Sequence, residues 1–456
     1  MRHAVLLLGL VGCAREPQRP NVLLVTVDTL RADRQPLCAR LGEFARESLV
    51  FERATSPRAK TSPAITSLMT GLYPHQHGVR ELLQPLAPNV PVLAEQLRDA
   101  GWSTAAIVGN WVLADARSGL ARGFEQWTED LPDAQRVPPD NVPERRARSL
   151  TDGALVALGL ERWKAGEAGP RASAIRDGKP WFLWLHYMDP HGAYDPPPQF
   201  RGAAVATEPI ERAGEVFVAE YNVPASARLS DGRIDAAAVR ALYDGEVRYV
   251  DAELGRLFDR LRGAGMLENT LVVVTADHGE SLGEQHYYFE HGRNVSEATC
   301  AVPLLVRFPA GRSGHDSSTV SLCDVAPMLL ELLGLRGGTN AEHPVFYEKV
   351  ERADLRGAVQ HKAVRLGRWK LERRYALGAP EPRIVGEELY DLAQDPHEQR
   401  DLLAAPPQDA PLARLQAELL RFSAADVHFP DLARKLAAER AALDPEARRI
   451  LEALGY

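Results

Sequence analysis

Three apolar runs along the chain each end in acidic or histidine side chains. They are NVLLVTVD (21–28), WFLWLHYMD (181–189) and TLVVVTADHGE (270–280). A continuous apolar run of this kind is typical of a central strand of a parallel sheet, which is buried on both faces. Because catalytic and ligand-binding groups of open α/β sheets collect at the carboxyl ends of the strands, we expect the polar ends of these three strands to meet at one place.

Segments with helical spacing alternate with these strands. Apolar side chains recur at i, i+3 and i+4 over residues 90–101 and 239–265, both of which end in glycine, and a third helix is predicted over residues 321–335. Strands that alternate with helices predict an α/β fold. We expect a large, doubly wound mixed or parallel sheet sandwiched by helices.

The pattern changes in two places. Residues 128–179 are rich in proline and charge and contain only a weak helix, which predicts a surface insertion near the site entrance. Beyond Gly337, short hairpin-like strands and helical segments rich in alanine and arginine predict a smaller α+β subdomain over residues 337–456. The predicted catalytic domain therefore spans residues 21–336.

Composition narrows the class of partner. The 456 residues carry a formal net charge of -8 and show no dense stripe of lysine and arginine, so a nucleic acid is not an expected partner. Small anionic esters, or glycans and lipids that carry them, remain as expected substrates. Outside the first residues the cysteines are Cys38, Cys300 and Cys323, which show no C-x-x-C spacing and allow at most one disulfide.

The first residues, MRHAVLLLGLVGCAREP, join a cationic start to a short apolar run and a cysteine. The run is too short for a permanent transmembrane helix, and the segment resembles a bacterial lipoprotein signal with its lipobox. We expect a signal peptide over residues 1–12, a lipid on Cys13 and a linker over residues 13–20. This predicts a protein anchored in the bacterial cell envelope, in the outer membrane facing the periplasm. The alternative is a short signal peptide with an incidental cysteine.

Seven segments in one order resemble the sulfatase family of the alkaline-phosphatase-like superfamily, and together they cover nearly the whole chain after the first residues. They are NVLLVTVDTLRADR, TSPAITSLMTGLYPHQHGV, HYMDPHGAYDPP, YDGEVRYVDAELGRL, TADHGESLGE, EHGRNVSEATCAVPLLVRFP and ELYDLAQDPHEQRDL. This resemblance implies an alkaline-phosphatase-like catalytic domain that hydrolyses esters with the help of a metal ion.

The resemblance places Asp28, Asp277, His278 and Thr61 at the metal ligands of the family. Two carboxylates, one imidazole and a hydroxyl oxygen suit Mn²⁺, Zn²⁺ or Mg²⁺. Calcium sulfatases usually carry a second acid after the first, and here that residue is Thr29, so Ca²⁺ is less favoured. The alternative is that the two aspartates only cap helices.

Thr61 stands where sulfatases carry the cysteine or serine that is oxidised to formylglycine. A secondary alcohol cannot undergo that oxidation, so Thr61 acts unmodified, as a metal-bound nucleophile at a helix N-terminus, or does not act. The alternative is that Thr61 only caps the helix that begins at Ser62 and Pro63.

Two cationic positions of the family are missing here. The arginine after the motif proline is Ile65, and the lysine and histidine of a G-K-W-H segment are Asn110 and Val112. Asn110 is a candidate substrate contact, as is Lys60 beside the nucleophile. A less positive pocket fits a singly charged diester better than a dianionic monoester.

Histidines supply the candidate proton donors. His191 and His291 are the expected catalytic acids, because histidine titrates near neutrality and His291 falls where sulfatases place a lysine or histidine facing the ester. His186 and Asp189 are candidate substrate contacts, and His186 can equally be structural. A second metal ion is not expected, because the position four residues after Asp189 is Ala193 and not histidine.

The favoured hypothesis is a metal-dependent hydrolase that acts on phosphate or phosphonate (di)esters, or on sulfate esters, through Thr61. Phosphorus is preferred because formylglycine releases sulfate by elimination, whereas a threonyl sulfate requires a second displacement. Three alternatives stay open: a sulfuric ester hydrolase that works without formylglycine, a phospho-group transferase of envelope lipids or glycans, and a non-catalytic lipoprotein that binds anionic esters.

Overall fold

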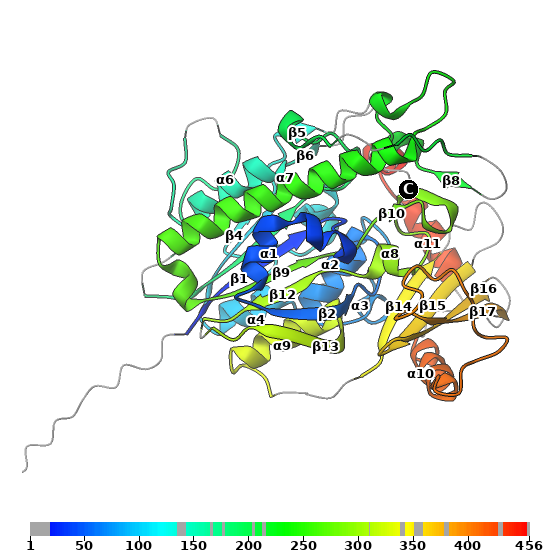
Figure 1. Cartoon of the computed structure of the whole chain (residues 1–456). Helices are drawn as coiled ribbons and strands as arrows, with labels where there is room; N and C mark the ends of the chain where they lie inside the picture. The colour runs from blue at the N-terminus through cyan, green and yellow to red at the C-terminus, as the bar shows by residue number, and fades with distance from the viewer. Residues whose placement is uncertain are drawn as a thin grey trace, which may run out of the picture.

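The computed structural model of the protein describes residues 19–134, 143–164, 167–175, 178–202, 206–211, 216–309, 311–337, 343–350, 359–377, 383–426 and 432–453. Its centre is an eight-stranded sheet with helices on both faces (Figure 1). The strand order is β13-β2-β12-β9-β1-β7-β3-β4. The strands are β1 (Asn21–Val27), β2 (Leu49–Thr55), β3 (Ser103–Val108), β4 (Gln126–Thr128), β7 (Trp181–Tyr187), β9 (Thr270–Ala276), β12 (Leu304–Arg307) and β13 (Gly314–Ser321).

The three apolar runs form the middle of this sheet, as predicted. β1 pairs in parallel with β7 on one side and with β9 on the other. Val27, the last residue of β1, lies opposite Tyr187 and Ala276, so the three strands end at the same level. β12 is antiparallel to β9, which makes the sheet mixed. The carboxyl ends of β1 and β9 therefore deliver Asp28 and Asp277 to one edge.

Helices cover both faces of the sheet and confirm the doubly wound α/β prediction (Figure 1). On one face the long helix α7 packs against α1 and α6, and on the other α2 packs against α3, α4 and α9. The predicted helices over residues 90–101, 239–265 and 321–335 are present with shorter or shifted bounds. The helices of both faces are α1 (Ala39–Ala45), α2 (Thr61–Thr70), α3 (Pro74–His77), α4 (Leu93–Asp99), α6 (Ala147–Ala157), α7 (Ala236–Gly263) and α9 (Val325–Leu332).

The predicted surface insertion over residues 128–179 is in part a core element. Its helix α6 packs against α7 and β3, and its Leu150, Ala154 and Leu155 are fully buried in the main hydrophobic core. The proline and charge that suggested a surface segment lie mostly in the chain around the helix. The helix itself buries an apolar face, which the composition of the whole segment does not reveal.

The C-terminal part forms a second, smaller sheet, as predicted. Its four antiparallel strands are covered by α10 (Leu412–Ala424), and Leu371 and Leu389 of the sheet pack against Leu415 and Leu419 of the helix. The last helix, α12 (Pro445–Ala453), instead places Leu451 in the core of the large domain. The strands are β14 (Val345–Val350), β15 (Val359–Leu366), β16 (Trp369–Ala376) and β17 (Arg383–Asp391).

A buried polar cluster joins the two sheets. The carboxylate of Glu348, on β14, accepts the backbone N–H of His75 at 2.6 Å, and the Glu348 N–H donates to the carbonyl of Pro57 at 2.9 Å. Asp426, just after α10, pairs with Arg80 and with Lys362. These contacts hold the small sheet against the loop that leads into α2.

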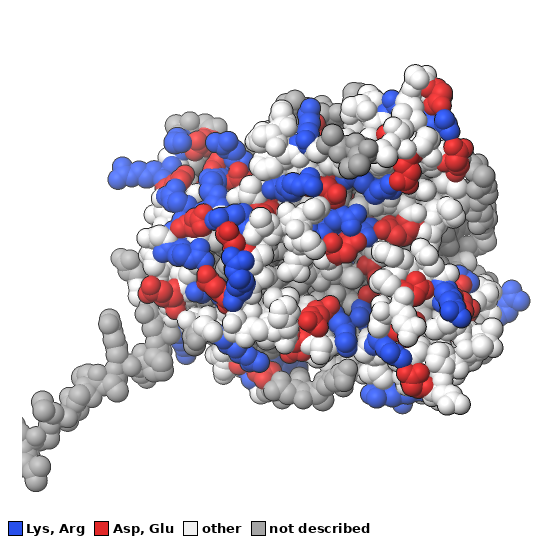
Figure 2. Space-filling model, viewed as in Figure 1, with Lys and Arg blue, Asp and Glu red and all other residues white. Residues whose placement is uncertain are grey.

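Other sequence expectations concern cysteines, charge and membranes. Cys38, Cys300 and Cys323 are all free and buried. On the face seen in Figure 2, basic and acidic side chains lie interspersed. Within the described part of the chain, no helix is both long enough and apolar enough to cross a bilayer. The predicted signal peptide and Cys13 lie outside the described residues.

Candidate metal centre and nucleophile

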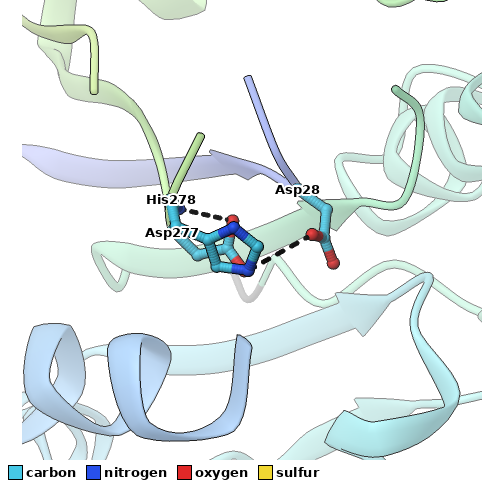
Figure 3. Close-up of side chains that lie close together, drawn as sticks. All are labelled: Asp28, Asp277 and His278. Atoms are coloured by element: carbon cyan, nitrogen blue, oxygen red, sulfur yellow. Dashed lines mark hydrogen bonds and ion pairs between the residues drawn. The ribbon is translucent and has the colours of Figure 1, made fainter. Parts of the chain in front are cut away.

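Asp28, Asp277 and His278 converge at the sheet edge where β1 and β9 end (Figure 3). One ligand atom from each of the three side chains lies within 4.8 Å of the others, and all three residues are fully buried. Thr29 turns the chain directly after Asp28 with a left-handed φ of 55°, and its N–H donates to Oδ1 of Asp277 at 3.2 Å. The register of the two parallel strands thus brings together residues that are far apart in the sequence.

The donor set fits a divalent cation. Oδ1 of Asp28 and Oδ2 of Asp277 are buried and have no hydrogen-bond partner among the described residues. Two buried carboxylates side by side are costly unless a positive charge compensates them. Nδ1 of His278 lies 2.9 Å from the carbonyl of Gly279, an arrangement that leaves Nε2 as the ligand atom. Two oxygens and one nitrogen therefore face the same point.

The two carboxylates have opposite pKa shifts. Burial raises the pKa of Asp277, and the negative charge of Asp28 raises it further, to about 8. Burial acts in the same direction on Asp28, but the hydrogen bond from His186 and the nearby histidine charges lower its pKa to about 2. Burial and the charge of Asp28 thus act on Asp277, while the histidines around Asp28 keep that carboxylate ionised.

Asn110 and His186 hold Asp28 in place. The Asn110 amide donates to Oδ2 of Asp28 at 2.6 Å, while its own oxygen accepts the N–H of Val112 at 3.0 Å. Nε2 of His186 lies 3.3 Å from the same Asp28 oxygen, and Nδ1 lies 2.9 Å from the hydroxyl of Thr26. Both residues were predicted to contact the substrate, with a structural role as the alternative for His186, and in the structure both contact a candidate metal ligand.

Thr61 lies beside this group. Its hydroxyl is 3.4 Å from Oδ2 of Asp28 and 3.5 Å from Nε2 of His278, and the residue is 3% exposed. Thr61 is the first residue of α2; the N-cap is Lys60, and no side chain caps the helix. Thr61 therefore does not serve as the helix cap. Its side chain faces the acids, and the N-terminus of a ten-residue helix lies directly behind it.

His291 lies beside His278, and His191 lies beside His291. The ring of His291 is centred 4.3 Å from that of His278 and 5.2 Å from that of His191. Nδ1 of His191 contacts the carbonyl of Gly192 at 2.7 Å, and Nδ1 of His291 contacts the carboxylate of Glu280 at 3.2 Å. Both expected proton donors are thus next to the candidate metal ligands.

Asp189 and Lys60, the other two candidate substrate contacts, each pair with a charged side chain of the protein. One oxygen of Asp189 pairs with Nε of Arg146 at 2.7 Å, and the other accepts the N–H of Ala147 at 2.6 Å, so this carboxylate anchors the start of α6. Lys60 pairs with Glu81, whose other oxygen binds Arg58 at 2.6 Å. A carboxylate therefore offsets both cations that precede the nucleophile.

Sequence reasoning missed Glu81, Glu280 and Arg146. Glu280 carries a local signal, since it follows the ligand His278 by two residues, at the end of an apolar strand. Glu81 and Arg146 carry no local signal in the sequence, because charged residues at such loop positions are common. Ile65, which replaces the expected arginine, is fully buried on α2.

A mixed α/β sheet with two acids and a histidine at its carboxyl edge, beside a hydroxyl at a helix N-terminus, defines a metal-dependent ester-hydrolysing enzyme. Comparison with known proteins makes the assignment specific. The family model named Sulfatase matches residues 20–335, and the chain belongs to the sulfatase family.

Relatives in this family cover most of the chain. The multifunctional alkaline phosphatase superfamily protein PehA of Trinickia caryophylli is 27% identical over 69% of this chain and 74% of its own length. The choline-sulfatase of Rhizobium meliloti is 24% identical over 85% of this chain and 83% of its own. The crystal structure of the phosphonate monoester hydrolase of Agrobacterium radiobacter shares the fold with a TM-score of 0.63 at 20% identity, covering 90% of this chain and 97% of that one.

Proposed function

We propose that this protein hydrolyses phosphate or phosphonate esters, with Thr61 as the nucleophile. The observation that carries the proposal is the position of the Thr61 hydroxyl, within 3.5 Å of both Asp28 and His278. A hydroxyl next to two candidate metal ligands is placed as a nucleophile requires, whereas a purely structural role does not explain this position.

Asp28, Asp277 and His278 would hold the cation. When bound, a divalent metal at such a site supplies Lewis-acid chemistry, because it offsets the charge of the ester oxygens and lowers the pKa of a neighbouring hydroxyl. We propose Mn²⁺, Zn²⁺ or Mg²⁺, since Thr29 replaces the second acid that a many-oxygen calcium site requires.

The residues of the chain carry the remaining steps. The Thr61 hydroxyl, which lies 3.4 Å from Oδ2 of Asp28, loses its proton to solvent while Thr61 Oγ1 forms a bond to phosphorus. The bond from phosphorus to the leaving oxygen breaks, and His291 gives that oxygen a proton. Water then attacks the threonyl ester and returns one proton to His291. The departing Thr61 oxygen takes a proton back from solvent.

Sulfate esters are the second candidate substrate, because a relative that matches 85% of the chain is a choline-sulfatase. Phosphorus is preferred on mechanistic grounds. A threonyl sulfate has no elimination route and must be displaced by water, whereas displacement at phosphorus is the ordinary route of a covalent phosphoenzyme.

The experiment compares three chromogenic p-nitrophenyl substrates, namely a phosphodiester, a phosphonate monoester and a sulfate, with purified protein in Mn²⁺ or Zn²⁺. Thr61→Val removes the hydroxyl but keeps the shape, and we expect kcat to fall by about a thousandfold or more. Thr61→Ser keeps a hydroxyl and is the matched control, with a loss within about tenfold. Equal rates in the wild type and Thr61→Val would exclude the nucleophile. A clear preference for the sulfate would favour the second candidate.

We also propose that Cys13 carries a lipid and that the catalytic edge of the sheet faces away from the membrane. The side chain of Arg19 donates to the carbonyl of Ala100 at 2.7 Å, and the backbone carbonyl of Arg19 accepts from the side-chain amide of Asn269 at 3.3 Å. Both contacts lie beside the starts of strands, at the edge of the sheet opposite Asp28 and Asp277. Metabolic labelling with palmitate tests this, because wild-type protein is expected to take up label and Cys13→Ser is not. Membrane fractionation of both proteins provides the second readout.

A further inference from the structure

Glu280 is fully buried and has contacts on both carboxylate oxygens. Oε1 lies 3.2 Å from Nδ1 of His291, and Oε2 accepts the hydroxyl of Tyr194 at 3.0 Å. Its backbone carbonyl accepts a hydrogen bond from Arg31 at 2.8 Å. Contacts on both oxygens therefore hold this carboxylate beside the imidazole, and Arg31 holds the backbone of the same residue.

The backbone explains why the two residues meet. The short strands β10 (Ser281–Leu282) and β11 (Tyr287–Glu290) are antiparallel, and Ser281 lies opposite Glu290. Glu280 and His291 are the next residue on each strand, so they face each other one step beyond the paired residues. Glu280 also follows the candidate ligand His278 by two residues. One loop therefore carries both a metal ligand and the carboxylate that contacts the expected proton donor.

A second chain of contacts stiffens this arrangement. The ring of Tyr194 packs edge-on against that of Tyr243, with centroids 5.6 Å apart. The hydroxyl of Tyr243 donates to the carbonyl of Thr29 at 2.8 Å. Since Thr29 directly follows Asp28, the support of His291 is tied to the same strand end as the candidate metal ligand.

We propose that Glu280, held by Tyr194, is the positioning residue for His291. Its carboxylate accepts the N–H of His291 Nδ1, so that proton exchange with the leaving group of the ester takes place at Nε2. A carboxylate on one imidazole nitrogen fixes the tautomer and the ring orientation. The inference rests on the proposed function, in which His291 is the proton donor that Glu280 positions.

The first test measures how the rate depends on the leaving group. A series of aryl phosphonate or phosphodiester substrates with phenols of increasing pKa is hydrolysed by the full-length protein saturated with Mn²⁺. A proton donor matters most for poor leaving groups. We expect Glu280→Gln to lower kcat/KM for the unsubstituted phenol by about a hundredfold, and that for the dinitrophenol by less than about threefold.

Two further variants separate positioning from general damage. Glu290→Gln is the matched control: Glu290 is buried beside the same histidine, but its carboxylate lies 3.9 Å from Nδ1 and accepts the backbone N–H of His291 instead. It should leave the leaving-group dependence unchanged. In the double variant with His291→Ala, Glu280→Gln should add almost nothing to the effect of His291→Ala alone. Equal losses for all substrates, or multiplied effects in the double variant, would overturn the proposal.

The second test does not need activity. In ¹⁵N spectra of histidine-labelled protein, with His291→Asn used to assign the signal, we expect a proton on Nδ1 of His291. A neutral ring with its only proton on Nε2 would overturn the proposal. A wild type that cleaves none of the esters, but shows the Nδ1 proton, would reject the proposed function and leave the positioning contact standing.

Discussion

The side-chain amide of Asn110 donates a hydrogen bond of 2.6 Å to Asp28, from a segment 82 residues away. Asn110 is thus a neutral donor that holds the carboxylate oxygen next to the nucleophile. An ammonium group at this place would compete with a cation for Asp28. The amide orients the carboxylate without that competition, and it leaves the other oxygen of Asp28 for a ligand bond.

Asn110→Ala should therefore weaken metal binding. Loss of the donor removes the shortest contact on Oδ2 of Asp28. Removal of such a supporting hydrogen bond typically costs tenfold to a hundredfold in affinity, so we expect a rise in Kd for Mn²⁺ of about thirtyfold. Calorimetric titration of the metal-free protein measures the constant. Asn222→Ala is the control, because Asn222 is also buried but donates to the carbonyl of Phe289. An unchanged Kd in Asn110→Ala would argue against the orienting role.

Removal of the metal should destabilise the fold. Without a cation, Oδ1 of Asp28 and Oδ2 of Asp277 lie buried with no hydrogen-bond partner among the described residues. A ligand present at a hundredfold excess over its Kd stabilises the native state by about 2.7 kcal/mol, so we expect a chelator to lower Tm by several degrees. Mn²⁺, Zn²⁺ or Mg²⁺ should restore Tm better than Ca²⁺.

Asp277→Asn provides the comparison for metal removal. It lacks one of the two carboxylates, so its Tm should respond little to chelator, while Asp231→Asn, at an exposed site, should respond like the wild type. Identical Tm values for wild-type protein with and without chelator would contradict a bound cation at this site.

Glu348 should make stability sensitive to acid. Burial would raise the pKa of this carboxyl, but the charge of Arg80 and the hydrogen bond with His75 hold it well below its ordinary value of 4.5. A group with a depressed folded-state pKa contributes stability above its unfolded pKa and loses it as the pH falls toward the folded pKa. The contribution is therefore complete at pH 7 and declines below about pH 4.5.

Glu348→Gln tests this by urea unfolding over a range of pH. We expect the variant to be less stable by about 2 kcal/mol at pH 7, with the difference from wild type shrinking as the pH falls below about 4.5. Glu47→Gln, at an exposed ion pair, should show no such trend. A constant difference at all pH values would show that the charge of Glu348 is not what stabilises the junction of the two sheets.

Glu81→Gln should shift the substrate preference. Glu81 pairs with Arg58 and Lys60, which directly precede the nucleophile, so loss of its charge makes this side of the site more positive. We expect the ratio of kcat/KM for a dianionic phosphate monoester to that for a diester to rise about fivefold. The ratio is independent of the fraction of active protein. Glu95→Gln, away from these cations, should leave it unchanged, and an unchanged ratio in Glu81→Gln would mean that these cations do not act on the substrate.

The sequence alone determined where the strands and the two candidate metal acids lie. The strands β1 and β9 are apolar along their whole length, so both of their faces must be buried. Strands buried on both faces belong in the middle of a sheet, and this brings Asp28 and Asp277 together at its carboxyl edge. The position of Thr61 at the start of a helix could also be predicted from the sequence, because the signals for that helix start are local.

Only the tertiary structure decided which atoms pair at the site. Asp189 follows the central strand β7 by two residues, much as Asp277 follows β9, yet its carboxylate turns to Arg146 and the start of α6. Asn110 and His186 bind Asp28, and Glu280 meets His291 through the register of a short hairpin. Such pairings join side chains that come from different elements. No local periodicity encodes them, because they depend on how loops pack after the sheet has formed.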